Sequence, residues 1–278
     1  MLFSCADKRL ELCVPQVMGI LNVTPDSFSD GGQFTSIERA CRHADEMVAD
    51  GAAFIDIGGE STRPGAKDVS LQEELDRVIP LIEYVGNTHD VCISVDTSKP
   101  QVMSAAVSAG AHLINDVRAL QVPGALAVAA QLQVPVCLMH MQGQPRSMQA
   151  SPEYGDIIKD ISTFFHERVA ACTAAGIAKE RLLLDPGFGF GKTLSHNYEL
   201  LHRLAEFSEF QLPLLIGLSR KSMIGNLLKV EVEQRVVGSV AAAMIAVQRG
   251  AHILRVHDVK ETMDMIKVMQ ACKHYDAL

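Results

Sequence analysis

The chain has 278 residues, of which 48% are hydrophobic and 21% charged, so it carries enough apolar material for a large core. This composition excludes a disordered chain and a small disulfide-stapled scaffold. A net charge of −8 has the wrong sign for a protein that holds nucleic acid or an anionic membrane by bulk charge. No apolar stretch approaches the ~18 residues that span a bilayer, so a membrane partner is not expected either.

Seven cysteines are present, an odd number without a Cys-x-x-Cys spacing, and several lie in apolar segments. This usage indicates reduced thiols, many of them in a core. Asp7, Lys8 and Arg9 precede any apolar run, which is unlike a secretory signal. We therefore expect a cytoplasmic location.

Short apolar runs rich in β-branched residues alternate with longer segments whose apolar residues recur every three or four positions. This alternation is typical of β–α units around a parallel sheet. Eight units in 278 residues leave about 35 residues each, enough for one strand and one helix. The expected strands are 17–21, 53–57, 91–95, 112–114, 135–139, 181–184, 213–217 and 252–256.

Helical periodicity is clearest in six segments, which are 36–50, 71–85, 99–109, 156–175, 198–205 and 232–249. No linker, charge block or change in composition divides the chain. The pattern therefore favours one (β/α)8 TIM barrel, a single α/β domain over residues 1–278, rather than two doubly wound halves. Residues 1–14 are expected to form a short N-terminal cap or hairpin across the bottom of the barrel.

In such a barrel the chemistry lies at the carboxyl ends of the strands, and nearly every expected strand here ends in polar residues. They are Asn22, the loop 58–65, Asp96, Asn115 with Asp116, His140, Asp185, the loop 219–222 and the segment 255–258. One such residue would usually be a helix cap or turn former. Eight groups on one rim instead predict a binding site.

These side chains form two chemical classes. Donors and cations that suit an anion are Arg63, Lys221, Arg255 and His257. Acceptors that suit the N–H groups of a flat ring are Asp96, Asn115 and Asp185. An anion and a nitrogen heterocycle are therefore both candidate ligands, and ion pairing between the two classes is the structural alternative.

The loop 185–193 carries several glycines, but three residues separate Gly187 from Gly191 where a nucleotide-binding P-loop needs four. We interpret it as a turn that presents Phe190 as an aromatic wall. The long connections 22–32 and 58–70 indicate lids, in which Phe28, Arg63 and Pro64 would meet substrate; tolerated surface insertions are the alternative.

A protein-built zinc site is not indicated, because no paired His or Cys spacing is present. Mg²⁺ fits the composition better, since it takes one or two protein oxygens and completes its shell with water and phosphate. Asn22 is the candidate ligand, and a turn-forming Asn before Thr-Pro is the alternative.

Eight segments together resemble the dihydropteroate synthase family. They are 18–32, 56–65, 94–98, 114–116, 138–143, 184–192, 219–222 and 255–258, and they extend over essentially the whole chain in order. The resemblance implies a transferase of folate biosynthesis and a target of sulfonamides. Such an enzyme condenses 6-hydroxymethyl-7,8-dihydropterin diphosphate with 4-aminobenzoate, using Mg²⁺, as a homodimer.

The resemblance also implies roles for individual residues. Pterin contacts would be Asp96, Asn115, Asp185, Lys221, Met139 and Phe190. The diphosphate and metal end would be Asn22 for the metal with Thr62, Arg63, Arg255 and His257. The 4-aminobenzoate positions would be Phe28, Pro64, Lys221 and Ser222, and the catalytic residues Lys221, Arg255, His257 and Arg63.

Three other functions are alternatives to this hypothesis. A pterin-binding barrel of the methyltetrahydrofolate methyltransferase type would use similar Asp and Asn contacts, but its ligand has no diphosphate to engage Arg63, Arg255 and His257. A barrel that only binds pterins would not need every rim residue. A Schiff-base aldolase built on Lys221 is disfavoured, because nothing nearby in the sequence indicates desolvation of that amine.

Overall fold

The chain forms a closed eight-stranded parallel barrel. The computed structural model describes residues 1–6, 8–23, 33–61, 68–143, 148 and 152–277. The barrel strands are β3 (Gln16–Asn22), β4 (Phe54–Gly58), β5 (Cys92–Asp96), β6 (Leu113–Asp116), β7 (Val136–Met139), β8 (Leu182–Asp185), β9 (Leu215–Ile216) and β10 (Ile253–Val256). Their spatial order is β8-β7-β6-β5-β4-β3-β10-β9, and a parallel bridge between Leu184 and Leu214 joins the two edges. The TIM-barrel prediction is confirmed, with all eight strands near their expected positions.

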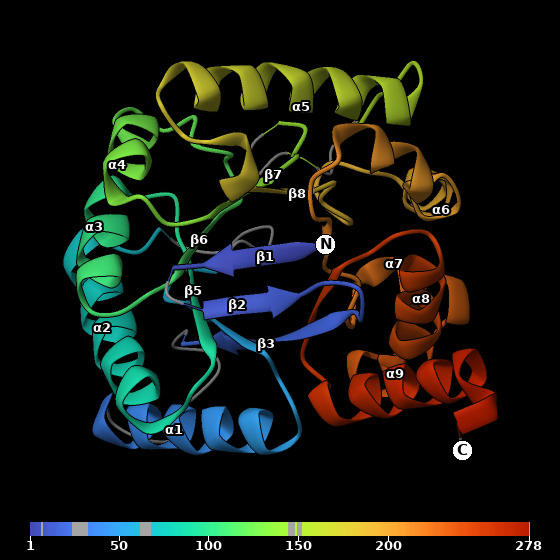
Figure 1. Cartoon of the computed structure of the whole chain (residues 1–278), viewed down its shortest axis with the longest axis horizontal. Helices are drawn as coiled ribbons and strands as arrows, with labels where there is room; N and C mark the ends of the chain where they lie inside the picture. The colour runs from blue at the N-terminus through green and yellow to red at the C-terminus, as the bar shows by residue number, and fades with distance from the viewer. Residues whose placement is uncertain (7, 24–32, 62–67, 144–147, 149–151, 278) are drawn as a thin grey trace.

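Helices surround the barrel as an outer ring (Figure 1). They are α1 (Gln33–Ala49), α2 (Leu71–Thr88), α3 (Pro100–Ser108), α4 (Ala125–Leu132), α5 (Ile157–Ala174), α6 (Leu194–His202), α7 (Ser222–Leu228), α8 (Val236–Gln248) and α9 (Val259–Lys273). Local sequence sets several of their starts. Ser70 and Glu73 form a capping box on α2, and the Asp156 side chain accepts the Ile158 and Lys159 N–H groups of α5.

The helix expectations needed correction in several places. Three helices, α4, α7 and α9, were not among the predicted segments. The first is short and almost wholly apolar, without an amphipathic stripe, and the second has only 7 residues. The segment expected at 198–205 begins earlier, after the Thr193 cap, and the one expected at 232–249 opens as a 3₁₀ turn before α8.

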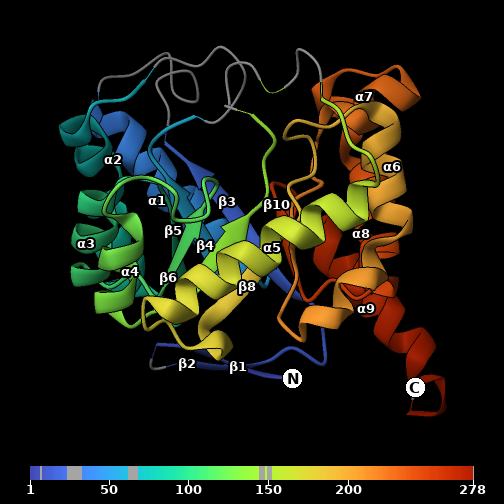
Figure 2. The ribbon, with the colours of Figure 1, turned by 90° about the horizontal axis from the view of Figure 1, so that it is seen from above.

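The N-terminal residues close the bottom of the barrel, as expected. β1 (Leu2–Cys5) pairs antiparallel with β2 (Lys8–Glu11). In Figure 2 this hairpin lies at the end of the barrel opposite α7. Its Phe3 and Cys5 are buried in one cluster with the first inward-facing residues of the strands, including Phe54 and Ile253. The barrel interior is therefore sealed from below by apolar side chains.

Inward-facing residues change from apolar to polar along each long strand, because alternate residues face the interior. On β4, Phe54 is followed by Asp56, and on β10, Ile253 is followed by Arg255. A second and larger apolar cluster fills the space between the strands and the helices. The polar end of the interior is thus the carboxyl end of the strands. Among the described residues, no helix combines the length and apolarity needed to cross a membrane.

Candidate active site

Arg255 joins four strands inside the barrel. From β10, its Nε donates to Asp56 Oδ2 on β4 at 2.5 Å, and its Nη2 donates to Asp96 Oδ2 on β5 at 2.8 Å. Asp56 Oδ2 also accepts from Asn115 Nδ2 on β6 at 3.1 Å. Burial lowers the pKa of Arg255, but the two carboxylates outweigh it and leave that pKa raised. This cation is therefore held in place and stays charged.

Asp56 is a site residue that the sequence analysis did not select. It is fully buried, and it stands in the apolar strand sequence Phe-Ile-Asp-Ile-Gly. A charged residue at an inward position of such a strand has to be paired, which is the signal that could have identified it. Asp116, next to Asn115, has a different role, because its carboxylate accepts the N–H groups of Arg118 and Leu120 and shapes the following turn.

Two carboxyl groups at the strand ends have pKa values near neutrality. Burial raises the pKa of Asp96 to about 7, although Arg255 opposes the change. Burial also raises the pKa of Asp185 to about 6, against the hydrogen bond from the Gly187 N–H at 2.7 Å and the charge of Lys221. Burial disfavours the charged form of both groups, so additional N–H donors from a ligand would stabilise their ionised forms.

The loop after β8 depends on glycine for close backbone contact. Gly187 has φ +69°, and a Cβ there would lie 1.9 Å from the His140 carbonyl oxygen. Gly191 has φ +62°, and a Cβ there would lie 2.4 Å from the Gln142 carbonyl oxygen. The loop therefore packs directly on the segment that follows β7.

Lys192 is buried beneath this loop. Its Nζ donates to the carbonyl oxygens of Gly187 at 2.8 Å and Phe190 at 3.1 Å, and lies 3.1 Å from His140 Nδ1. Burial lowers the pKa of Lys192 to about 7. Burial also lowers the pKa of His140, and the charge of the neighbouring Lys192 lowers it further. Lys192 thus holds the loop from inside, a role that the sequence analysis missed.

Lys221 and Phe190 lie together at the rim. The Lys221 Nζ lies 4.2 Å from the centroid of the Phe190 ring, a cation–π contact. The neighbouring Arg220 turns away, because both Nε and Nη2 bind the Asp258 carboxylate. Ser222 is the first residue of α7. The expected aromatic wall at Phe190 is therefore beside the expected cation.

Asn22 and Asp96 face each other across Gly58. The three residues are partners in the parallel register of β3, β4 and β5. A Cβ on Gly58 would lie 3.1 Å from Asn22 Oδ1 and 3.4 Å from the Asp96 Cβ. The missing side chain at Gly58 leaves a space lined by an amide oxygen and a carboxylate.

His257 and Met139 complete the predicted rim that the structure describes. The Ser219 hydroxyl oxygen lies 3.1 Å from both the backbone nitrogen and Nδ1 of His257, and so orients the ring. Met139 ends β7 beside Asp185 in the register. It also borders a cavity of about 220 Å³ that extends toward Phe164.

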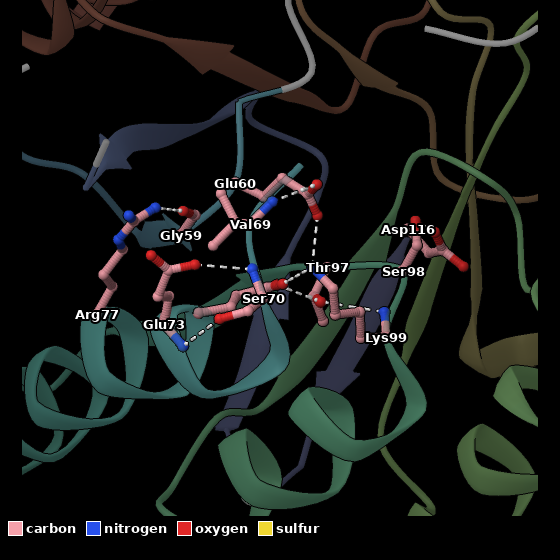
Figure 3. Close-up of polar contacts among 11 residues, drawn as sticks. Gly59, Glu60, Val69, Ser70, Glu73, Arg77, Thr97, Ser98, Lys99 and Asp116 are labelled. Carbon is pink, nitrogen blue, oxygen red and sulfur yellow. Dashed lines mark hydrogen bonds and ion pairs between the residues drawn. The ribbon is translucent and has the colours of Figure 1, made fainter. Parts of the chain in front are cut away.

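Lys99 links the end of β5 to the connection after β4 (Figure 3). Its Nζ binds the carboxylates of Glu60, at 2.7 Å, and Glu74. Glu74 is fully buried and also accepts the Thr97 hydroxyl at 2.5 Å. Burial lowers the pKa of Lys99, but the two glutamates leave it raised. Thr97 and Lys99, just after Asp96, therefore belong to an ionic network that is centred on the buried Glu74 and is partly exposed at Lys99 and Glu60.

Two further hydrogen bonds hold the described ends of the β4–α2 connection, and one of them involves Glu60 of this network. Arg77 Nη1 donates to the Gly59 carbonyl oxygen at 2.8 Å, and the Val69 N–H donates to Glu60 Oε1 at 3.4 Å. Four predicted residues, Phe28, Thr62, Arg63 and Pro64, lie outside the described residues.

A family model described as pterin binding enzyme matches residues 18–257, which include every barrel strand except the start of β3. The dihydropteroate synthase of Escherichia coli (strain K12) is 60% identical over 262 residues, which cover 94% of this chain and 93% of that protein.

Two solved structures are also very similar. The Yersinia pestis dihydropteroate synthase with a sulfonamide drug has a TM-score of 0.94 and 59% identity, covering 98% of this chain and 99% of that one. The Xanthomonas albilineans dihydropteroate synthase with 4-aminobenzoic acid has a TM-score of 0.93 and 52% identity, covering 98% of each chain. The chain therefore belongs to the dihydropteroate synthase family of transferases.

Proposed function

We propose that this chain condenses 6-hydroxymethyl-7,8-dihydropterin diphosphate with 4-aminobenzoate to give 7,8-dihydropteroate and diphosphate. The observation that carries the proposal is the buried set of acceptors, Asp96, Asn115 and Asp185, beside the Lys221–Phe190 pair. Such a set matches the N–H-rich edge of a pterin. The 4-aminobenzoic acid and the sulfonamide in the two related structures support 4-aminobenzoate as the second substrate and sulfonamides as inhibitors.

In this proposal the pterin ring binds between the acceptors and the Phe190 face, with Met139 packing near it. Breaking the C–O bond to diphosphate leaves positive charge on the pterin methylene, which the ring delocalises. Arg255 and His257 would stabilise the negative charge on the departing diphosphate, together with Thr62 and Arg63. Arg255 uses Nε and Nη2 for its carboxylate partners, and Nη1 takes part in neither contact.

The oxygen atoms of Asn22 and Asp96, which approach each other over Gly58, suit Mg²⁺. Among the described residues, no group of three or more His, Cys, Asp or Glu side chains could hold a metal ion. Asn22 Oδ1 and the nearby Asp96 carboxylate still offer the one or two hard oxygens that Mg²⁺ takes from protein when phosphate and water supply the rest. When bound, the ion would neutralise charge on the diphosphate.

The attacking group is the aniline nitrogen of 4-aminobenzoate. An aniline is unprotonated at neutral pH, so diphosphate or water can take the proton released after attack, and no single residue has to act as general base. Phe28, Pro64, Lys221 and Ser222 would bind this substrate at the rim. Because the pterin acceptors lie deeper, inside the barrel, we expect pterin to bind first.

The deciding experiment measures diphosphate release and dihydropteroate formation from dihydropterin diphosphate, with and without 4-aminobenzoate and Mg²⁺. Stoichiometric formation of both products, dependent on the second substrate and lost on chelation of the metal, supports the proposal. Tight pterin binding without turnover would refute it. Methyltetrahydrofolate would then be tested as ligand, as expected for the methyltransferase type of barrel.

A second copy of the chain is the expected partner. On α8, Val237 is 81% exposed, and Met244 and Ile245 are also exposed, as are Leu227 and Leu228 on α7. Exposed apolar side chains on adjoining helices are typical of an oligomer interface. Light scattering should show a dimer that Val237→Glu disrupts, whereas Gln72→Glu on α2, across the barrel in Figure 1, should not.

A cytoplasmic location remains part of the proposal. All seven cysteines lie within the described residues, and none forms a disulfide. Reduced cysteines are typical of that compartment.

A further inference from the structure

The orientation of the Asn115 amide is fixed by Asp56. Arg255 Nε is a donor, so the Asp56 Oδ2 atom that it contacts at 2.5 Å is an acceptor. The same Oδ2 lies 3.1 Å from the end of the Asn115 amide, which must therefore be the NH₂ end. Rotating the amide by 180° would place two acceptors against each other in a buried site.

This orientation decides what Asn115 presents to a ligand. One Nδ2 proton is committed to Asp56, and the amide oxygen is left as an acceptor. Asn115 is the register partner of Asp96, the last residue of β5, so it lies near the carboxyl ends of the strands. An amide held the other way would present its NH₂ group in place of that acceptor.

We propose that Asp56 is a specificity-determining residue: by holding the Asn115 amide in one orientation, it selects ring edges that carry an amino group over edges that carry a carbonyl. For pteridines this selects a 2-amino-4-oxo ring over a 2,4-dioxo ring. The inference rests on the proposed function, because it takes Asn115 as a pterin contact.

The surroundings of Asp56 support this role. Within the described part of the chain, neither Asp56 Oδ1 nor Ser94 Oγ has a hydrogen-bond partner, although both atoms are buried. Asp56 and Ser94 are partners in the register of β4 and β5. The polar contacts of Asp56 are thus directed to Arg255 and Asn115 through a single oxygen.

The contacts of Asp56 predict different effects for two substitutions at this position. In Asp56→Asn, the amide oxygen can keep the Oδ2 position, and the new NH₂ group can face Ser94. That variant retains the acceptor for Asn115 and is the matched control. Asp56→Leu has a similar volume but no acceptor, so the Asn115 amide can turn.

The experiment titrates the wild type and both variants with 6-hydroxymethylpterin and with 6-hydroxymethyllumazine, its 2-oxo counterpart. We expect the wild type to prefer the pterin by about 100-fold or more, as for sites that hydrogen-bond a specific ligand group. Asp56→Asn should keep this ratio within about threefold, and Asp56→Leu should lower it at least tenfold. An unchanged ratio in Asp56→Leu would overturn the proposal.

The outcomes separate this inference from the proposed function. If the wild type binds no pterin, the proposed function fails; if it binds pterin and Asp56→Leu keeps the preference, only the inference fails. If Asp56→Leu does not fold, NMR of the wild type tests the inference instead, by measuring how fast the side-chain amide protons of Asn115 exchange with solvent. Slow exchange of one proton supports the proposal, and exchange as fast as in an exposed asparagine overturns it.

Discussion

Replacing Asp96 by Asn should stabilise the free protein while it abolishes pterin binding. Asp96 is only 9% exposed, and burial raises its pKa to about 7, although Arg255, which it shares with Asp56, opposes the change. An unfolded Asp has a pKa of about 3.9, and a difference of one pKa unit corresponds to about 1.4 kcal/mol. At pH 8 the ionised carboxylate therefore destabilises the fold by up to about 4 kcal/mol relative to a neutral isostere.

The pH dependence identifies the cause. Because the folded pKa is raised, the penalty is absent below about pH 4, grows as the pH rises to about 7, and is complete above it. Calorimetry should thus show a melting temperature about 5–10 °C higher for Asp96→Asn at pH 8, with a much smaller difference at pH 5. The exposed Asp50→Asn serves as control. A less stable Asp96→Asn protein at pH 8 would refute the reasoning, since the ion pair with Arg255 would then outweigh burial.

Three further outcomes follow from the geometry. Gly187 has φ +69°, and the Cβ of Gly187→Ala would lie 1.9 Å from a backbone oxygen, so this variant should lower the free energy of unfolding by about 3 kcal/mol or more. The Cβ of the control Gly110→Ala meets nothing within 4 Å, so the loss should be about 1 kcal/mol. Urea unfolding measures both. Lys99→Met should destabilise the protein by about 3 kcal/mol, because it leaves the buried Glu74 charge unpaired. Adding Glu74→Gln should restore most of the lost stability. No recovery in the double variant would argue against the ion pair. Pterin affinity should rise about tenfold from pH 5 to pH 7 as Asp185, with a pKa of about 6, ionises; a flat calorimetric titration series would contradict this.

The barrel could be predicted from the sequence because period and spacing are local properties. Eight apolar runs at regular intervals predicted eight β–α units, and the polar residues after these runs predicted a common rim at the strand ends. Two of the missed helices, α4 and α7, had weak local signals, whereas α9 has buried residues at three- and four-residue spacing and could have been recognised. In α4, burial against the barrel replaces an amphipathic stripe, so its helical state depends on tertiary packing.

The site was predicted at the rim and missed below it. Asn22, Asp96 and Asp185 are the last residues of their strands, where a polar side chain stands out. Asp56 and Lys192 act from inside the barrel and beneath a loop, and their importance depends on partners such as Arg255, 199 residues away along the chain from Asp56. A charged residue in an apolar strand is visible in the sequence, but which distant residue pairs with it is not.

The hairpin at the bottom of the barrel restricts how ligands enter and leave the site. Because Phe3 and Cys5 close the lower end, the polar interior can be reached only from the carboxyl ends of the strands. Anything that reaches Asn115 or Asp185 enters past the rim and leaves by the same route. If pterin binds at these residues and 4-aminobenzoate at the rim, as proposed above, the pterin has to enter first and cannot leave while the second substrate is bound.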